Sequence, residues 1–180
     1  MAGYFYVQME ELNMAHAVVR TDNMHGTDVR PELISVRFQV VSDGTSTPTA
    51  IDNGNIVKLN GFETGSRSVY IGVTPASTDT VDDVVLIATP EVMYDERLHN
   101  LDEYENEAGK ICRGYRLHEH SMFGLTADGF SGTPQVGKHV SIGSGTKLVI
   151  GTGAGIGEIV RKDVVGRYTY YVVDIKPVSA

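Results

Sequence analysis

Apolar and polar residues alternate most regularly between residues 33 and 41, LISVRFQVV. A period of two places successive side chains on opposite faces of an extended chain, so this run predicts a β-strand with one buried face. We interpret the polar segment that follows, residues 42–50, as a loop. The apolar residues that follow this period of two are Ile34, Val36, Phe38 and Val40.

Two Asn-Gly dipeptides interrupt the next apolar stretch, residues 51–62. Asn53-Gly54 and Asn60-Gly61 are of the type that type I′ hairpin turns favour, because both central residues of such a turn have positive φ. The stretch therefore predicts a β-hairpin.

Short strand-like runs separated by glycine-rich turns continue along the chain. No long crossover helix is predicted, which argues against a parallel α/β sheet. We expect a mostly β fold: a small antiparallel β-barrel or β-sandwich with an extended N-terminal arm and long loops. Further strands are predicted at residues 68–73, 84–88, 110–117, 122–127, 138–142, 146–150 and 168–177, with a turn at Asp128-Gly129.

The pattern divides the chain into an N-terminal arm (1–31), a hairpin-rich region (32–90) and a C-terminal barrel-like region (91–180). The last two regions form either one domain or two. Residues 91–107 fit either a helix or a loop that wraps over the barrel. The arm fits either a helix or an extended segment lying across a neighbour; its apolar residues are Met9, Leu12, Met14, Val18 and Val19.

The formal net charge of −8 argues against nucleic acid as a partner, because such binding depends on Lys and Arg neutralising phosphates. The acidity is local: residues 79–107 hold ten Asp or Glu and one basic residue, Arg97. No apolar stretch approaches the roughly 20 residues of a membrane-spanning helix, so no membrane association is expected. The N-terminal residues lack the pattern of a signal peptide. The lone Cys112 is expected to be a buried or half-buried, inert thiol.

Two glycine-rich segments resemble nucleotide-binding motifs, and we expect neither to bind a nucleotide. Residues 132–139 fit GxxxxGK, but His139 stands where a Ser or Thr hydroxyl is required, and a turn leading into a strand is expected instead. In residues 151–158 no frame of GxGxxG is complete, and we interpret this segment as a wide glycine loop between two strands.

Other candidate chemistry is equally incomplete. His118 and His120 would lie on one face of a strand, as two metal ligands could, with His99 or His139 completing the site, but an exposed polar strand edge is the preferred interpretation. The carboxylates of residues 95–107 are expected to be solvated rather than a glycosidase pair. Ser144 lacks the spacing of a nucleophile elbow. We therefore expect no catalytic residue, no cofactor and no metal ligand.

The segments YDE, NLDEYENEAGK, RGYRL and MFGLTADGF carry a family signal. This succession resembles head decoration or minor capsid proteins of tailed bacteriophages, in which an acidic lead precedes AGK, an RGY-L strand and an F-LT--G strand. The later VGKHVSI, TKLVI and YYVVDI fit the closing strands of such barrels. The resemblance covers residues 94–177. Where the family has a polar GD before the Phe strand, this chain has HEHSM.

The resemblance implies a non-enzymatic structural protein on the exterior of a phage capsid, made in the bacterial host cytoplasm. Its implied partners are the major capsid protein, whose neighbouring subunits it stabilises, and further copies of itself, with a trimer favoured. A β-tulip-like barrel is one form that such a fold takes. The residues expected to bind a partner lie in the arm: Leu12, Met14, Val18, Val19 and Arg20.

Two alternatives remain open at this stage. One is another virion component, such as a tail or baseplate piece or a glycan-binding surface module. The other is a small enzyme on a β scaffold, which would require His118, His120 and a third ligand to hold a metal.

Overall fold

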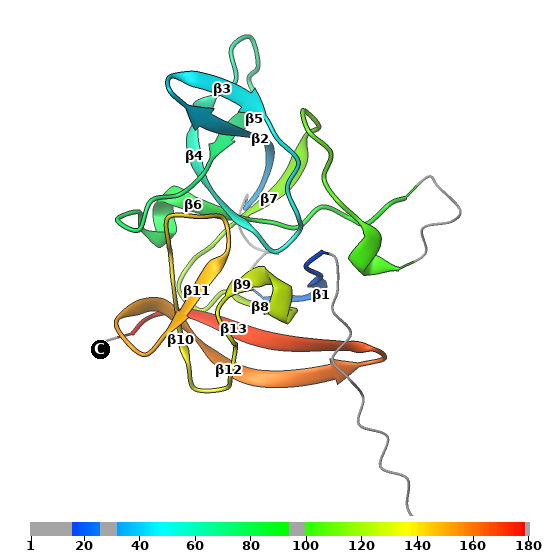
Figure 1. The fold of residues 1–180 in the computed structure, drawn as a ribbon, viewed down its shortest axis with the longest axis vertical. Helices are drawn as coiled ribbons and strands as arrows, with labels where there is room; N and C mark the ends of the chain where they lie inside the picture. Colours follow the sequence, from blue (N-terminus) through cyan, green and yellow to red (C-terminus); the bar gives the residue numbers. More distant parts are fainter. Residues whose placement is uncertain (1–15, 26–31, 94–99, 179–180) are drawn as a thin grey trace, which may run out of the picture.

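A computed structural model describes residues 16–25, 32–93 and 100–178 of the chain. These residues form β-strands and three short 3-10 turns, which confirms the mostly β prediction. Figure 1 shows a barrel, drawn mainly in blue to green, above a second sheet drawn mainly in yellow to red.

The barrel has five strands that close on themselves through a β2–β7 pairing. The pair β2–β5 is parallel and the other neighbours are antiparallel, so the barrel is mixed rather than purely antiparallel. The strands in ring order are β2 (Leu33–Ser42), β5 (Val69–Val73), β4 (Ile56–Phe62), β6 (Val84–Ile87) and β7 (Cys112–Arg116).

Glycines make room inside this small barrel. A Cβ added at Gly72 would lie 2.7 Å from Val36 Cγ1, and one added at Gly114 would lie 2.9 Å from Val36 Cγ2. Both positions face the interior, where only a hydrogen fits beside Val36. The buried side chains of this interior are Val36, Phe38, Ile51, Val57, Val85, Ile87 and Cys112.

The segment predicted to be a loop after β2 is instead a hairpin. β3 (Thr45–Pro48) pairs with β2 through a turn at Asp43 and Gly44, whose φ angles are 49° and 75°. Asp-Gly is a strong type I′ signal. The prediction was wrong because the polar residues of β3 are all exposed and leave no apolar alternation to detect.

The Asn-Gly hairpin prediction was wrong in its turns. Gly54 and Gly61 have positive φ, but neither preceding Asn does, so neither dipeptide is a type I′ turn. Gly61 lies inside β4, where the register with β5 shifts. The chain turns between β4 and β5 at residues 63–68, which include Gly65 at φ 82°.

The second sheet has the strand order β1-β8-β13-β12-β10-β11-β9. Its largest unit is the hairpin of β12 and β13, eleven residues each, which turns at Gly166. The strands are β1 (Val19–His25), β8 (Met122–Leu125), β9 (Phe130–Ser131), β10 (His139–Ser141), β11 (Leu148–Gly151), β12 (Gly155–Val165) and β13 (Tyr168–Val178).

The glycine segment predicted as a wide loop is only partly a loop. Gly155 and Gly157 already belong to β12 and pair with β13. A Cβ at Gly157 would lie 2.5 Å from the Asp174 carbonyl oxygen, so the backbone of β13 requires glycine there. The glycines that suggested a loop therefore allow a close strand pairing.

Strand β6 joins the two layers because it is buried on both faces. Val85 and Ile87 point into the barrel, whereas Val84 and Leu86 point into the core between the barrel and the second sheet. All four are at most 1% exposed. This core also contains Phe123, Leu125, Leu148, Ile159, Tyr171 and Val173 from the second sheet.

The strands cross the boundaries drawn from sequence. β7 lies within the region 91–180 but completes the barrel, and β1 lies within residues 1–31 but pairs with β8 in the second sheet. Each layer is thus built from both halves of the chain.

Replacing Leu86 with Ala should lower the free energy of unfolding by about 2–5 kcal/mol, because it leaves a cavity between the two layers. Urea unfolding followed by far-ultraviolet circular dichroism and by tyrosine fluorescence should give one coincident transition. Val164→Ala, at a position 65% exposed, is the control and should change stability by no more than about 0.5 kcal/mol. Two separate transitions would contradict the shared core.

Candidate functional site

The arm residues predicted to bind a partner do not share one environment. Leu12 and Met14 lie outside the described residues. Val18 and Val19 are buried within this chain, at 1% and 4% exposed. Arg20 is partly buried, with its guanidinium 5.7 Å from the centre of the Tyr170 ring.

Backbone and side-chain hydrogen bonds fix the segment that contains Val18. Its N–H donates to Thr126 Oγ1 at 3.0 Å, and its carbonyl accepts from the Thr126 N–H at 3.1 Å. Thr126 is fully buried, so these bonds are shielded from water. Val18 and Val19 therefore anchor the N-terminal segment to its own second sheet.

Strand β1 offers an edge for further pairing. It is the terminal strand of its sheet, and one side pairs with β8 through Val19–Leu125 and Arg20–Gly124. Within the described ranges, no strand pairs with its other side. Unpaired peptide groups of an edge strand can accept a strand from another chain, so β1 is the candidate interaction site.

A buried asparagine network fixes the loop that leads into β4. Asn53 donates to the Thr89 carbonyl at 2.8 Å and accepts from the Thr89 N–H at 2.9 Å. Asn106 donates to Asn53 Oδ1 at 3.0 Å and to the Ile51 carbonyl at 2.9 Å. Both Asn side chains are almost fully buried. Sequence analysis missed this network because Asn53 precedes a glycine and was interpreted as a turn residue.

The described end of the acidic segment reaches the second sheet. Asp102, in the 3-10 turn Leu101–Glu103, forms an ion pair with Arg167 and accepts a hydrogen bond from the Tyr168 hydroxyl at 2.9 Å. Arg167 and Tyr168 lie at the tip of the β12–β13 hairpin. Of the two alternatives for residues 91–107, the described part thus corresponds to a loop that contacts another element rather than an α-helix.

Two other carboxylates of the acidic segment 79–107 accept hydrogen bonds that stabilise nearby turns. The Lys58 ammonium, together with the Ala76 N–H, lowers the pKa of Asp79. Hydrogen bonds from the Thr80 N–H and hydroxyl lower the pKa of Asp83. These groups stay ionised and stabilise turns at the barrel edge.

The two-histidine arrangement expected on a strand is absent from the structure. Glu119 and His120 form a turn, His120 has φ 69°, and its N–H donates to the Ile175 carbonyl at 2.7 Å. His118 Nε2 lies 3.4 Å from Glu32 Oε1, while His139 Nδ1 lies 2.7 Å from the Gly153 carbonyl. His99 is outside the described residues. Across the described ranges, no grouping of possible metal ligands includes His118 or His120.

Two further interpretations are confirmed. Residues 132–138 form a loop with a turn at Val136 and Gly137, and β10 begins at His139, so the GxxxxGK match leads into a strand. Cys112 is buried in the barrel, and burial raises the pKa of its thiol to about 11.

Comparison with family models, curated proteins and solved structures found no match to this chain. Among the residues described, no helix has the length and hydropathy to cross a membrane.

Replacing Asn53 with Ala should lower the free energy of unfolding by about 1–3 kcal/mol, because buried partners on Thr89 and Asn106 lose their hydrogen bonds. Asn60→Ala is the matched control, since Asn60 also precedes a glycine but is exposed. Equal urea midpoints for the two variants would contradict a structural role for the network.

The Cys112 thiol should react slowly with a disulfide reagent while the protein is folded. With a pKa of about 11, roughly one thiol in a thousand is ionised at pH 8, and burial blocks access as well. Burial of the neutral Cys112 thiol raises its pKa in the folded protein above the value of 9.0 for a free thiol. The contribution of this thiol to the free energy of unfolding is therefore complete below pH 9 and is lost as the pH rises toward 11. Labelling in urea should be at least about a hundredfold faster. Equal labelling rates with and without urea would be inconsistent with this environment.

Proposed function

We propose that this chain is a non-enzymatic structural protein of a tailed-phage virion that binds the outer surface of the capsid lattice and stabilises neighbouring major capsid subunits. The observation that carries the proposal is the outer side of β1, with which no strand of the described residues pairs. Val18 and Val19 anchor this edge strand to the second sheet. Residues 1–15, with Leu12 and Met14, precede this strand in the sequence and are joined to it by residues 16–18. The short motifs of residues 94–177 on which the resemblance rests, such as AGK and RGYRL, support the same role.

Exposed apolar side chains supply further contact area. Val40 and Val41 lie on the β2–β3 hairpin, and Val164 and Val165 lie near the tip of the β12–β13 hairpin. Phe62, 54% exposed, stacks on Tyr70 with ring centres 4.2 Å apart. Aromatic and branched apolar side chains that project from a rigid scaffold are suited to contacts with adjacent subunits.

The overall charge agrees with a place outside the capsid. A protein with net charge −8 is repelled by packaged DNA.

The chain self-associates in this proposal, most simply as a trimer. Light scattering coupled to size-exclusion chromatography measures the number of chains in the assembly.

The direct test uses expanded capsids assembled from the major capsid protein of the virus that encodes this chain. Purified protein is added, and the particles are imaged by electron cryomicroscopy. Ordered density on the outer surface at a repeated lattice position is expected. A protein that stays folded by circular dichroism but decorates no lattice position contradicts the proposal.

Deleting residues 1–15 should weaken capsid occupancy at least tenfold while the circular dichroism spectrum stays the same. This deletion leaves the buried residues Ala17, Val18 and Val19 in place, whereas a deletion to residue 24 would also remove most of β1. Unchanged occupancy would show that the arm does not bind the lattice.

A further inference from the structure

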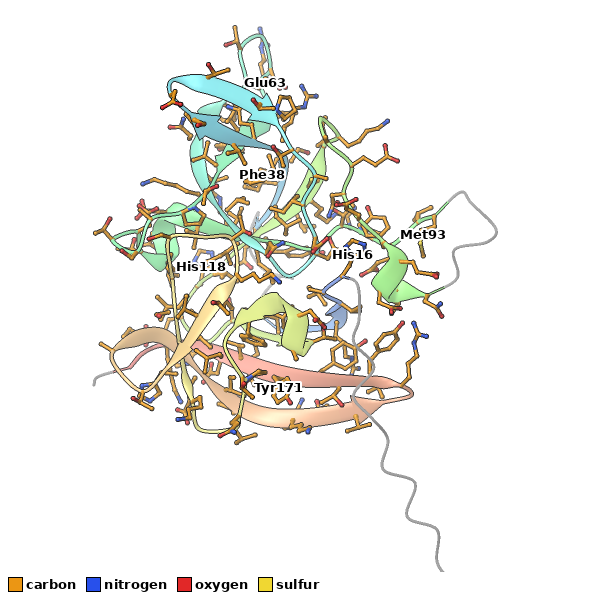
Figure 2. The ribbon with its side chains drawn as sticks, viewed as in Figure 1. His16, Phe38, Glu63, Met93, His118 and Tyr171 are labelled. Carbon is orange, nitrogen blue, oxygen red and sulfur yellow. The ribbon has the colours of Figure 1, made fainter. Side chains whose placement is uncertain are left out.

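Three side chains from distant parts of the chain meet near the junction of the barrel and the second sheet. One possible ligand atom from each of His16, Asp52 and Glu105 lies within 4.8 Å of the other two. His16 Nδ1 is 2.9 Å from Asp52 Oδ1. Figure 2 labels His16 between the barrel and the second sheet.

The backbone forces the two carboxylates together. Ile51 and Asn106 form an antiparallel bridge, with N–H···O bonds of 3.0 and 3.1 Å in both directions. In an antiparallel pair the next residue of one strand faces the preceding residue of the other, so Asp52 lies opposite Glu105. Like charges directly opposite each other are destabilising unless a cation lies between them.

Independent evidence for a ligand comes from Asn55. This residue is 5% exposed, and its Oδ1 atom has no hydrogen-bond partner. Asn55 lines the same hollow as Asp52 and Glu105, which has a volume of about 430 Å³. Buried amide oxygens are normally paired, so a missing donor is indicated there.

We propose that His16, Asp52 and Glu105 bind a divalent transition-metal ion of the Zn²⁺ class. One imidazole nitrogen and two carboxylate oxygens are ligands that Zn²⁺ accepts, whereas Mg²⁺ and Ca²⁺ prefer oxygen alone. Three protein ligands leave a position for water. In this proposal a metal-bound water donates to Asn55 Oδ1, which lines the same hollow as Asp52 and Glu105.

The ion has a structural consequence for the N-terminal segment. His16 precedes β1, which belongs to the second sheet, whereas Ile51 packs in the barrel core beside Asp52. A metal held by both would fasten the start of the described N-terminal segment to the barrel. The site is thereby independent of whether the chain binds a capsid.

The test is a calorimetric titration of the full chain, freed of any affinity tag and treated with chelator, with Zn²⁺, Mn²⁺, Mg²⁺ and Ca²⁺ separately. One Zn²⁺ per chain is expected, with Zn²⁺ bound at least tenfold more tightly than Mg²⁺ or Ca²⁺. At 100 times the dissociation constant, Zn²⁺ should raise Tm by about 5–10 °C. No saturable binding by the folded protein overturns the proposal.

Matched variants locate the ion. His16→Ala and Glu105→Gln should each weaken Zn²⁺ binding at least tenfold, with unchanged circular dichroism. His118→Ala and His139→Ala should leave the affinity unchanged, because neither residue belongs to the group. An equal loss in either histidine control overturns the assignment.

Lys147 provides a separate check, since it is exposed and also lines the hollow. If its ammonium were the only cation that the carboxylates attract, no metal would be needed. The proposal expects Lys147→Gln to bind Zn²⁺ as tightly as the unaltered chain, or more tightly, because a competing positive charge is removed. A tenfold loss in this variant counts against the metal site.

Discussion

The rest of the structure depends on the burial of β6 on both faces. A strand with apolar residues at four consecutive positions exposes one row of side chains wherever only one of its faces is covered. Here Val85 and Ile87 fill the core of a five-stranded barrel, while Val84 and Leu86 pack in the core against the second sheet. Both hydrophobic cores therefore depend on this one strand. The glycines at positions 72 and 114 allow the narrow interior to close around Val36.

Buried side-chain hydrogen bonds are concentrated in the loops beside this shared core. Asn53 and Asn106 join residues 51–53, Thr89 and residues 104–106 through bonds that are hidden from water. Because the Ile51–Asn106 bridge sets the register there, it also decides which side chains become neighbours. The same few hydrogen bonds that hold the loops thus create the proximity of Asp52 and Glu105, on which the metal proposal rests.

Sequence patterns found the strands that have one or two clearly apolar faces, including β2, β6, β7 and β13. They missed β3, whose residues are all exposed, and β12, whose glycines allow a close strand pairing. The candidate site was less predictable. Val18 and Val19 looked like contact residues because their partners are distant in sequence: Thr126 lies 108 positions from Val18, and Val19 pairs with Leu125. The grouping of His16, Asp52 and Glu105 has no local pattern at all.

The hydrogen bonds between Val18 and Thr126 also limit when the N-terminal segment can fold during synthesis. β1 leaves the ribosome before β8, its pairing partner, which is made about a hundred residues later. At roughly 5–20 residues per second the apolar segment Ala17 to Val19 waits for several seconds without its sheet. Pairings this distant in sequence also slow folding, because the chain must close a long loop before the contact forms. The N-terminal strand is therefore made first and placed late, and during that interval its apolar residues are open to other chains, including copies made on neighbouring ribosomes.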